Sequence, residues 1–129
     1  MHDVVGALLE VRRRLGASAR RSGRPPDAVR LVAVTKGVDV AVMAAALDAG
    51  VTDLGESRAQ EMLAKAPELA GRAPVWHFVG RIQRNKAGAL APLVACWHGV
   101  DRVEVGAAVA RRSAGASVYV QVNVDEDPA

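Results

Sequence analysis

Residues 31–54 read Leu-Val-Ala-Val-Thr-Lys-Gly-Val-Asp-Val-Ala-Val-Met-Ala-Ala-Ala-Leu-Asp-Ala-Gly-Val-Thr-Asp-Leu. The stretch opens with an apolar, β-branched run at Leu31–Thr35, which is typical of a buried strand. An alanine-rich segment at Val40–Ala49 predicts a helix, and Gly50 is a residue type that commonly ends one. A second strand is predicted at Thr52–Leu54. Strand, helix and strand in so short a stretch indicate a βα unit of a parallel sheet.

The same unit recurs along the rest of the chain. Runs rich in β-branched or aromatic residues begin at positions 31, 52, 75, 96 and 117. These predicted strands are Leu31–Thr35, Thr52–Leu54, Val75–Val79, Cys96–Val100 and Ser117–Val124. The predicted helices between them are Val40–Ala49, Arg58–Ala66, Asn85–Leu93 and Val103–Arg112. Because right-handed crossovers set successive strands side by side, units of even size favour a TIM-type (β/α) barrel over a doubly wound sheet. The L-x-x-L-x-L pattern of a leucine-rich solenoid is missing.

The length of the chain limits how much of a barrel it can form. Eight such units and a first helix need about 200 residues, whereas the 129 residues provide five strands. We therefore expect an α/β fold in the form of an incomplete barrel, with about five of eight strands, as one domain over 1–129. Residues 1–30 form its N-terminal helix and linker, and residues 31–129 form the βα units. A sheet that cannot close leaves two edge strands, so we also expect self-association through them.

Residues 3–22 predict an amphipathic helix, which Gly23 and the following prolines end. Its apolar residues recur at helical spacing: Val4, Leu8, Val11 and Leu15. Seven arginines against three acidic residues give positions 1–30 a charge of +4, and the net charge of +3 leaves −1 for the remainder. A solvated helix surface explains this basic face more simply than an anionic partner does, so no nucleic-acid partner is expected.

Composition excludes several other classes of protein. Half of the residues are hydrophobic and 3% are aromatic, which disfavours both disorder and a base-stacking surface. No apolar run approaches the roughly 18 residues of a membrane span, so we expect a cytoplasmic protein with no membrane partner. Cys96 is the single cysteine and lies in an apolar run, which indicates a small core residue. The three histidines lack zinc-site spacing, so no metal is predicted.

Chemistry in such barrels lies at the carboxyl ends of the strands, where Lys36 follows the first run. The chain has three lysines against fourteen arginines. A lysine amine can lose its proton when desolvated and react with an aldehyde, whereas arginine stays charged. The alternative is a lysine stem that lies along the strand with its ammonium group in water.

The third run, Val75–Val79, contains His77 and leads through Gly80 into a basic turn. A packed, hydrogen-bonded histidine is a more frequent outcome than a direct functional role. The basic residues of the turn could hold a phosphate or cap a helix, and no phosphate-loop glycine spacing supports the first reading. They are Arg81, Arg84 and Lys86. No G-x-S-x-G motif is present to suggest a hydrolase nucleophile.

Together these motifs resemble the pyridoxal phosphate homeostasis proteins, whose barrel is like the N-terminal domain of alanine racemase. The first matching segments are Leu-Val-Ala-Val-Thr-Lys at 31–36 and Leu-Gly-Glu-Ser-Arg-Ala-Gln-Glu at 54–61. Trp-His-Phe-Val-Gly-Arg-Ile-Gln-Arg-Asn-Lys at 76–86 is the most specific of them. Val-Asp-Arg at 100–102 and Val-Gln-Val-Asn at 120–123 continue the resemblance in the same order, so that it extends from about residue 4 onward.

The resemblance implies that Lys36 holds pyridoxal 5′-phosphate (PLP) covalently as a Schiff base. His77 matches a histidine of the family's third strand and is expected near the cofactor or in the floor beneath it. Ser57 stands where the family usually has an asparagine near the cofactor. The family's phosphate-binding segment lies further along the chain than residue 129. We therefore expect a weakened affinity for PLP.

The resemblance also implies a role in intracellular vitamin B6 and amino-acid homeostasis without turnover. The expected partners are PLP itself and PLP-dependent apo-enzymes. Racemase chemistry needs a second acid or base opposite the lysine, and Tyr119, inside the fifth run, is a poor candidate for it. The alternative is the amino-terminal part of a PLP-dependent, racemase-like enzyme. A binding module without cofactor, meeting nucleic acid through the first helix, is a further alternative.

Overall fold

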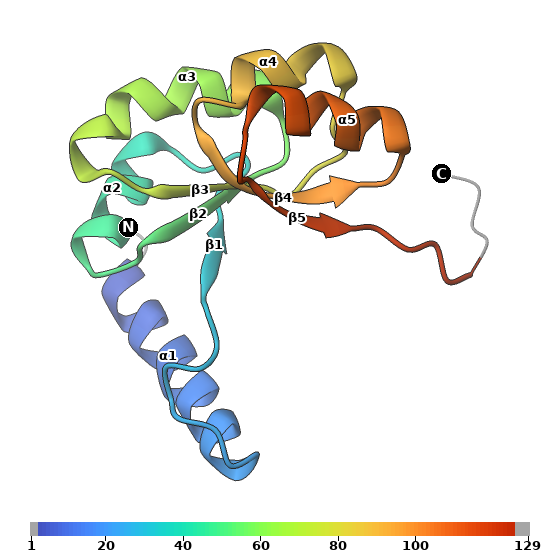
Figure 1. Cartoon of the computed structure of the whole chain (residues 1–129). Helices are drawn as coiled ribbons and strands as arrows, with labels where there is room; N and C mark the ends of the chain where they lie inside the picture. The colour runs from blue at the N-terminus through green and yellow to red at the C-terminus, as the bar shows by residue number, and fades with distance from the viewer. Residues whose placement is uncertain (1–2, 126–129) are drawn as a thin grey trace.

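The computed structural model describes residues 3–125 as one parallel sheet with helices packed against it (Figure 1). The strands pair in the order β1-β2-β3-β4-β5, and every pair is parallel. Their bounds are β1 Val32–Val34, β2 Asp53–Glu56, β3 Val75–Phe78, β4 Val94–Val100 and β5 Ser117–Val120. This order confirms the predicted parallel α/β fold, and the sheet has the strand order of an open section of a barrel. Among the described residues, β1 and β5 have no second neighbour.

Helices connect the strands and cover one side of the sheet. Their bounds are α1 Val4–Arg21, α2 Val40–Asp48, α3 Ala59–Leu69, α4 Ala87–Leu90 and α5 Val103–Arg112, with 3₁₀ turns at Ala70–Arg72 and Arg84–Lys86. In Figure 1, α3, α4 and α5 lie along the same side of the sheet, whereas α1 stands apart from them and packs against α2. No helix within residues 3–125 is long and apolar enough to cross a membrane.

The register divides the strand residues between two faces, because residues paired across a parallel sheet point to the same side. Leu54 pairs with Trp76, and Phe78 pairs with Trp97, so these four side chains form a buried row beneath the helices. On the opposite face, Asp53, His77 and Cys96 form a polar row that continues to β5. A register shift between Trp76 and His77 makes Ala95 an extra residue of β4 and sets Cys96 opposite His77. The division places the apolar row, with Glu56 at its end beside Phe78, on the side of the helices, and Asp53, His77 and Cys96 on the other side.

Several boundaries differ from the predicted ones. The fifth strand ends at Val120, not Val124, because β4 ends at Val100, whose carbonyl already accepts from Gln121, and offers no further pairing partner. The predicted helix Asn85–Leu93 is reduced to a 3₁₀ turn and α4, which ends two residues before Pro92, where proline disfavours helical geometry. By contrast, α3 continues beyond Ala66 because Leu69 in its last turn is fully buried. The division of the chain at residue 30 stays a prediction.

Candidate functional site

Lys36 lies in the turn directly after β1, at the carboxyl end of the strand. Its side chain is exposed, and it forms no hydrogen bond or ion pair with any residue in the range 3–125. The turn continues into Gly37, whose φ of 70° lies in the left-handed region that glycine adopts without strain. The structure therefore presents a free primary amine on a tight turn at the strand end.

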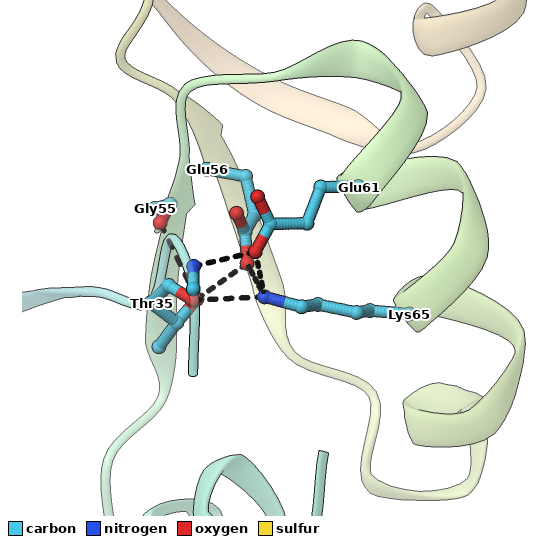
Figure 2. Close-up of polar contacts among 6 residues, drawn as sticks. Thr35, Gly55, Glu56, Glu61 and Lys65 are labelled. Carbon is cyan, nitrogen blue, oxygen red and sulfur yellow. Dashed lines mark hydrogen bonds and ion pairs between the residues drawn. The ribbon is translucent and has the colours of Figure 1, made fainter. Parts of the chain in front are cut away.

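A buried cluster of polar groups holds both sides of this turn (Figure 2). Before Lys36, the hydroxyl of Thr35 donates to Glu56 Oε1 at 2.8 Å, and the carbonyl of Thr35 accepts from Lys65 Nζ at 2.8 Å. After Lys36, the backbone N–H of Gly37 donates to Glu61 Oε1 at 2.5 Å. Since Glu56 ends β2 and Glu61 and Lys65 belong to α3, two other elements fix the backbone on either side of Lys36.

Lys65 is the centre of this cluster. Its ammonium group lies 2.8 Å from Glu56 Oε1 and 2.6 Å from Glu61 Oε1. Burial alone would lower the pKa of Lys65, but the hydrogen bonds and charges of the two carboxylates outweigh it and raise that pKa. The hydrogen bond from Lys65, supported by that from Gly37, lowers the pKa of Glu61. Lys65 therefore stays charged and bonded to its partners, whereas Lys36 has no bonding partner among residues 3–125.

Ser57 lies directly after β2, half-buried, at the edge of a hollow of about 600 Å³. The hollow is also lined by Arg58, Arg81 and Lys86, and no carboxylate is among its lining residues. Two members of the basic turn predicted after the third strand thus lie beside Ser57. Lys36 does not line this hollow.

The loops that follow β2 and β3 approach each other closely at Gly80. A Cβ atom at Gly80 would clash with the backbone carbonyl of Ser57, and one at Gly99 would clash with the carbonyl of Gly80. Glycine at these two positions therefore permits the ends of β2, β3 and β4 to pack backbone against backbone. This packing fixes the position of the loop that carries Ser57.

His77 lies on the face of the sheet opposite α3, α4 and α5 and is buried. Its Nε2 is 2.7 Å from Asp53 Oδ2, and its Nδ1 is 2.9 Å from His98 Nε2. The register aligns His77 with Gly55 and hence with Val34, two residues before Lys36 and two strands away. The structure therefore places His77 in a hydrogen-bonded row below the strand end, apart from Lys36.

The charges of this row favour an ionised Asp53 and a neutral His98. Burial opposes ionisation of Asp53, but hydrogen bonds from Thr52 and His77, together with the charge of Arg30, lower its pKa. Burial also lowers the pKa of His98, and His77 adds to the effect. In addition, the His98 ring packs against Tyr119 with ring centroids 5.0 Å apart.

Sequence reasoning missed the side chains that position the turn. Glu56 ends β2 and is fully buried, and a buried carboxylate needs a partner nearby, but its burial is visible only in the structure. Glu61 and Lys65 stand four residues apart in a predicted helix, the spacing of an ion pair. That both groups reach back across the sheet to Thr35 and Gly37 depends on packing between elements, which the sequence does not display.

Comparison with known proteins agrees with the family resemblance that the sequence motifs indicated. The chain is 37% identical over 128 residues to the pyridoxal phosphate homeostasis protein of Pseudomonas aeruginosa, which covers 96% of this chain and 56% of that protein. It is 39% identical over 145 residues to the protein of the same name from Mycobacterium tuberculosis, again covering 56% of that protein. The chain is homologous to the pyridoxal phosphate homeostasis proteins. It spans about half the length of these relatives. No family model matches it.

Solved structures agree with this homology to pyridoxal phosphate homeostasis proteins. A crystal structure of a protein from Bifidobacterium adolescentis superposes with a TM-score of 0.79 and 33% identity, covering 87% of this chain and 52% of that one. PipY of Synechococcus elongatus, solved with PLP bound, gives a TM-score of 0.73 and 32% identity, covering 86% of this chain and 54% of that one. The fold is therefore that of the matched part of these proteins.

Proposed function

We propose that this protein binds PLP through Nζ of Lys36 and acts in vitamin B6 homeostasis inside the cell. The observation that carries the proposal is the contrast between two lysines. Lys36 is exposed and unpaired among the described residues, on a turn fixed from both sides, whereas Lys65 is buried between Glu56 and Glu61. Homology to proteins named for this role supports it.

The residues around Lys36 fit a small aldehyde ligand. When bound, PLP supplies a reversible covalent bond to a primary amine and an electron-withdrawing ring. Lys36 offers that amine, and the Thr35 and Gly37 bonds hold its backbone still. Ser57, at the end of the neighbouring strand, is the proposed polar contact beside it. His77 has both ring nitrogens engaged, so we assign it to the floor beneath the strand ends.

We further propose that PLP is held without turnover. Racemisation or transamination needs an acid or base that moves a proton on the bound substrate. The ionisable groups against the Lys36 turn are Glu61, Glu56 and Lys65, and they form ion pairs with one another. Because the bond to Lys36 is reversible and no reaction consumes the cofactor, we propose that the protein delivers PLP to PLP-dependent apo-enzymes.

Reductive trapping tests this assignment. PLP is added to the purified chain, the complex is reduced with borohydride, and the modified peptide is mapped by mass spectrometry. We expect modification at Lys36 and loss of the PLP absorption band in Lys36→Ala. The matched control is Lys86→Ala, which removes an exposed lysine of the 3₁₀ turn Arg84–Lys86 and should leave the band unchanged.

Two results would contradict the proposal. One is modification centred on Lys65 or Lys86 in the unaltered chain. The other is a PLP band of equal intensity in Lys36→Ala and in the unaltered chain. Turnover of a free amino acid by the PLP-loaded chain would instead overturn only the non-catalytic part and favour the racemase-like alternative.

A further inference from the structure

Three potential metal ligands meet on the face of the sheet opposite α3, α4 and α5. The ligand atoms of His77, Cys96 and His98 all lie within 4.8 Å of one another. His77 belongs to β3, the other two belong to β4, and the register shift at Ala95 sets Cys96 beside His77. His77 lies far from Cys96 and His98 in the sequence, and the three residues lack a zinc-finger spacing, which is why the sequence predicted no metal here.

We propose that His77, Cys96 and His98 bind a zinc ion. Two imidazoles and a thiolate are the ligand types that Zn²⁺ prefers, and three protein ligands leave a fourth position for water. Cys96 and His77 are buried and His98 is partly buried, so the ion would be shielded on the protein side and reachable from the open face. A hollow of about 480 Å³ lies over this row and is lined by all three residues.

Asp53 prepares His77 for this role. A carboxylate can only accept, so the 2.7 Å contact with Asp53 Oδ2 means that His77 Nε2 carries the proton. In the neutral ring, the other nitrogen, Nδ1, is the free ligand atom, and it lies 2.9 Å from His98 Nε2. A carboxylate behind a metal-binding histidine is the arrangement that fixes the ring and its tautomer in known zinc sites.

The present spacing is close to that of a zinc site. Zn–N bonds near 2.0 Å and tetrahedral angles set two ligand nitrogens about 3.3 Å apart. The His77–His98 pair at 2.9 Å must therefore open by a few tenths of an ångström. The ligand atoms lie within 4.8 Å of one another, and Zn–S bonds near 2.3 Å need an S–N separation of about 3.6 Å, so Cys96 must move inward by about 1.2 Å at most. Side-chain rotation alone supplies shifts of this size.

Binding of the zinc ion displaces a proton from the site. With His77 in this neutral tautomer, His98 Nε2–H donates to His77 Nδ1 in the metal-free state. On binding, that proton moves to His98 Nδ1 through solvent, and both facing nitrogens coordinate the zinc. The Cys96 thiol loses its proton to solvent and coordinates as a thiolate, so one proton is released for each ion bound.

Cobalt(II) titration of the chain tests the site, because cobalt replaces zinc and reports its ligands. We expect intense visible d–d bands of a tetrahedral ion, a thiolate-to-cobalt charge-transfer band, and loss of both when Zn²⁺ is added. Calorimetry with Zn²⁺ in two buffers of different ionisation enthalpy should show release of one proton. Cys96→Ser should abolish the charge-transfer band, and His98→Gln should abolish tetrahedral binding.

Two further variants separate a built site from adventitious binding. Asp53→Asn keeps all three ligands and should weaken Zn²⁺ binding by about 10–100-fold. His2→Gln removes the remaining histidine of the chain and should leave binding unchanged. Circular dichroism checks the fold of each variant, and if Asp53→Asn does not fold, the Cys96→Ser comparison decides. Cobalt bound without a thiolate band, or with equal affinity in Cys96→Ser, would overturn the proposal.

Discussion

Lys65 determines where the Lys36 turn sits, because its ammonium group joins three separate segments of the chain. It donates to the Thr35 carbonyl after β1, to Glu56 at the end of β2, and to Glu61 in its own helix. Glu61 completes the arrangement by accepting from Gly37. A single lysine–glutamate pair therefore connects α3 to the backbone on both sides of the proposed PLP-binding residue.

This pair predicts a pH dependence of stability. The pKa of Glu61 in the folded chain lies below its ordinary value of 4.5, because Lys65 and Gly37 stabilise the ionised form. A lowered folded pKa contributes stability above pH 4.5 and loses it as the pH falls through the folded pKa. Glu61→Gln should therefore be less stable than the unaltered chain at neutral pH, and the difference should shrink in acid.

Urea unfolding at neutral pH and well below pH 4.5 measures this difference. Glu68→Gln, exposed on the same helix, is the matched control and should change stability little at neutral pH. A gap between Glu61→Gln and the unaltered chain that stays constant across the acid range would contradict the prediction. Borohydride trapping of PLP by Glu61→Gln would show in addition how far the reaction of Lys36 with PLP depends on the fixed turn.

At the scale of the elements, the glycines after β3 and in β4 decide how closely the strand ends pack. A side chain at Gly80 would meet the Ser57 carbonyl, which is backbone and cannot rotate away. We expect Gly80→Ala to destabilise the fold by about 1–3 kcal/mol, as overpacking does. Gly71→Ala is the control, because nothing lies within 4 Å of its added Cβ, and it should stay within about 0.5 kcal/mol. Equal unfolding free energies for the two variants would show that the loop moves freely.

The elements themselves were largely predictable, and the reason is their repetition. Strands at regular spacing with alanine-rich segments between them define βα units, whatever the exact ends. The ends depend on neighbours: Val122 and Val124 continue the strand pattern, but β4 provides nothing for them to pair with. The candidate site was likewise predictable where it depends on local sequence and not where it depends on neighbouring elements. The strand end with Lys36 was visible in the sequence, whereas the contacts of Glu56 and Lys65 and the meeting of His77 with Cys96 depend on packing and register.

At the scale of the whole molecule, the described sheet has two unpaired edges. All four residues of β5 are exposed, and Val120 is 71% accessible. Parallel edge strands with apolar side chains offer free backbone groups to another chain. A polypeptide of residues 1–129 should therefore associate as its concentration rises, which sedimentation velocity over a dilution series would measure.

Two substitutions of exposed valines test whether the edge is responsible. Val120→Lys places a charge on β5 and should shift the association to higher concentration. Val103→Lys places the same charge on α5, at a valine that is 86% accessible, and should leave association unchanged. A polypeptide that stays monomeric at every concentration would show that the edges are protected.

The sequential order of the strands has a consequence for how the chain acquires its shape during synthesis. Within residues 3–125, each strand bonds only to the preceding and the following one, as when Thr35 bonds to Gly55, 20 residues away. No contact within the sheet has to wait for a distant segment to leave the ribosome. Each newly emerged unit can dock on the one before it, so the sheet can grow vectorially from its amino-terminal side. Hydrogen exchange on stalled nascent chains should then show protection that advances one unit at a time.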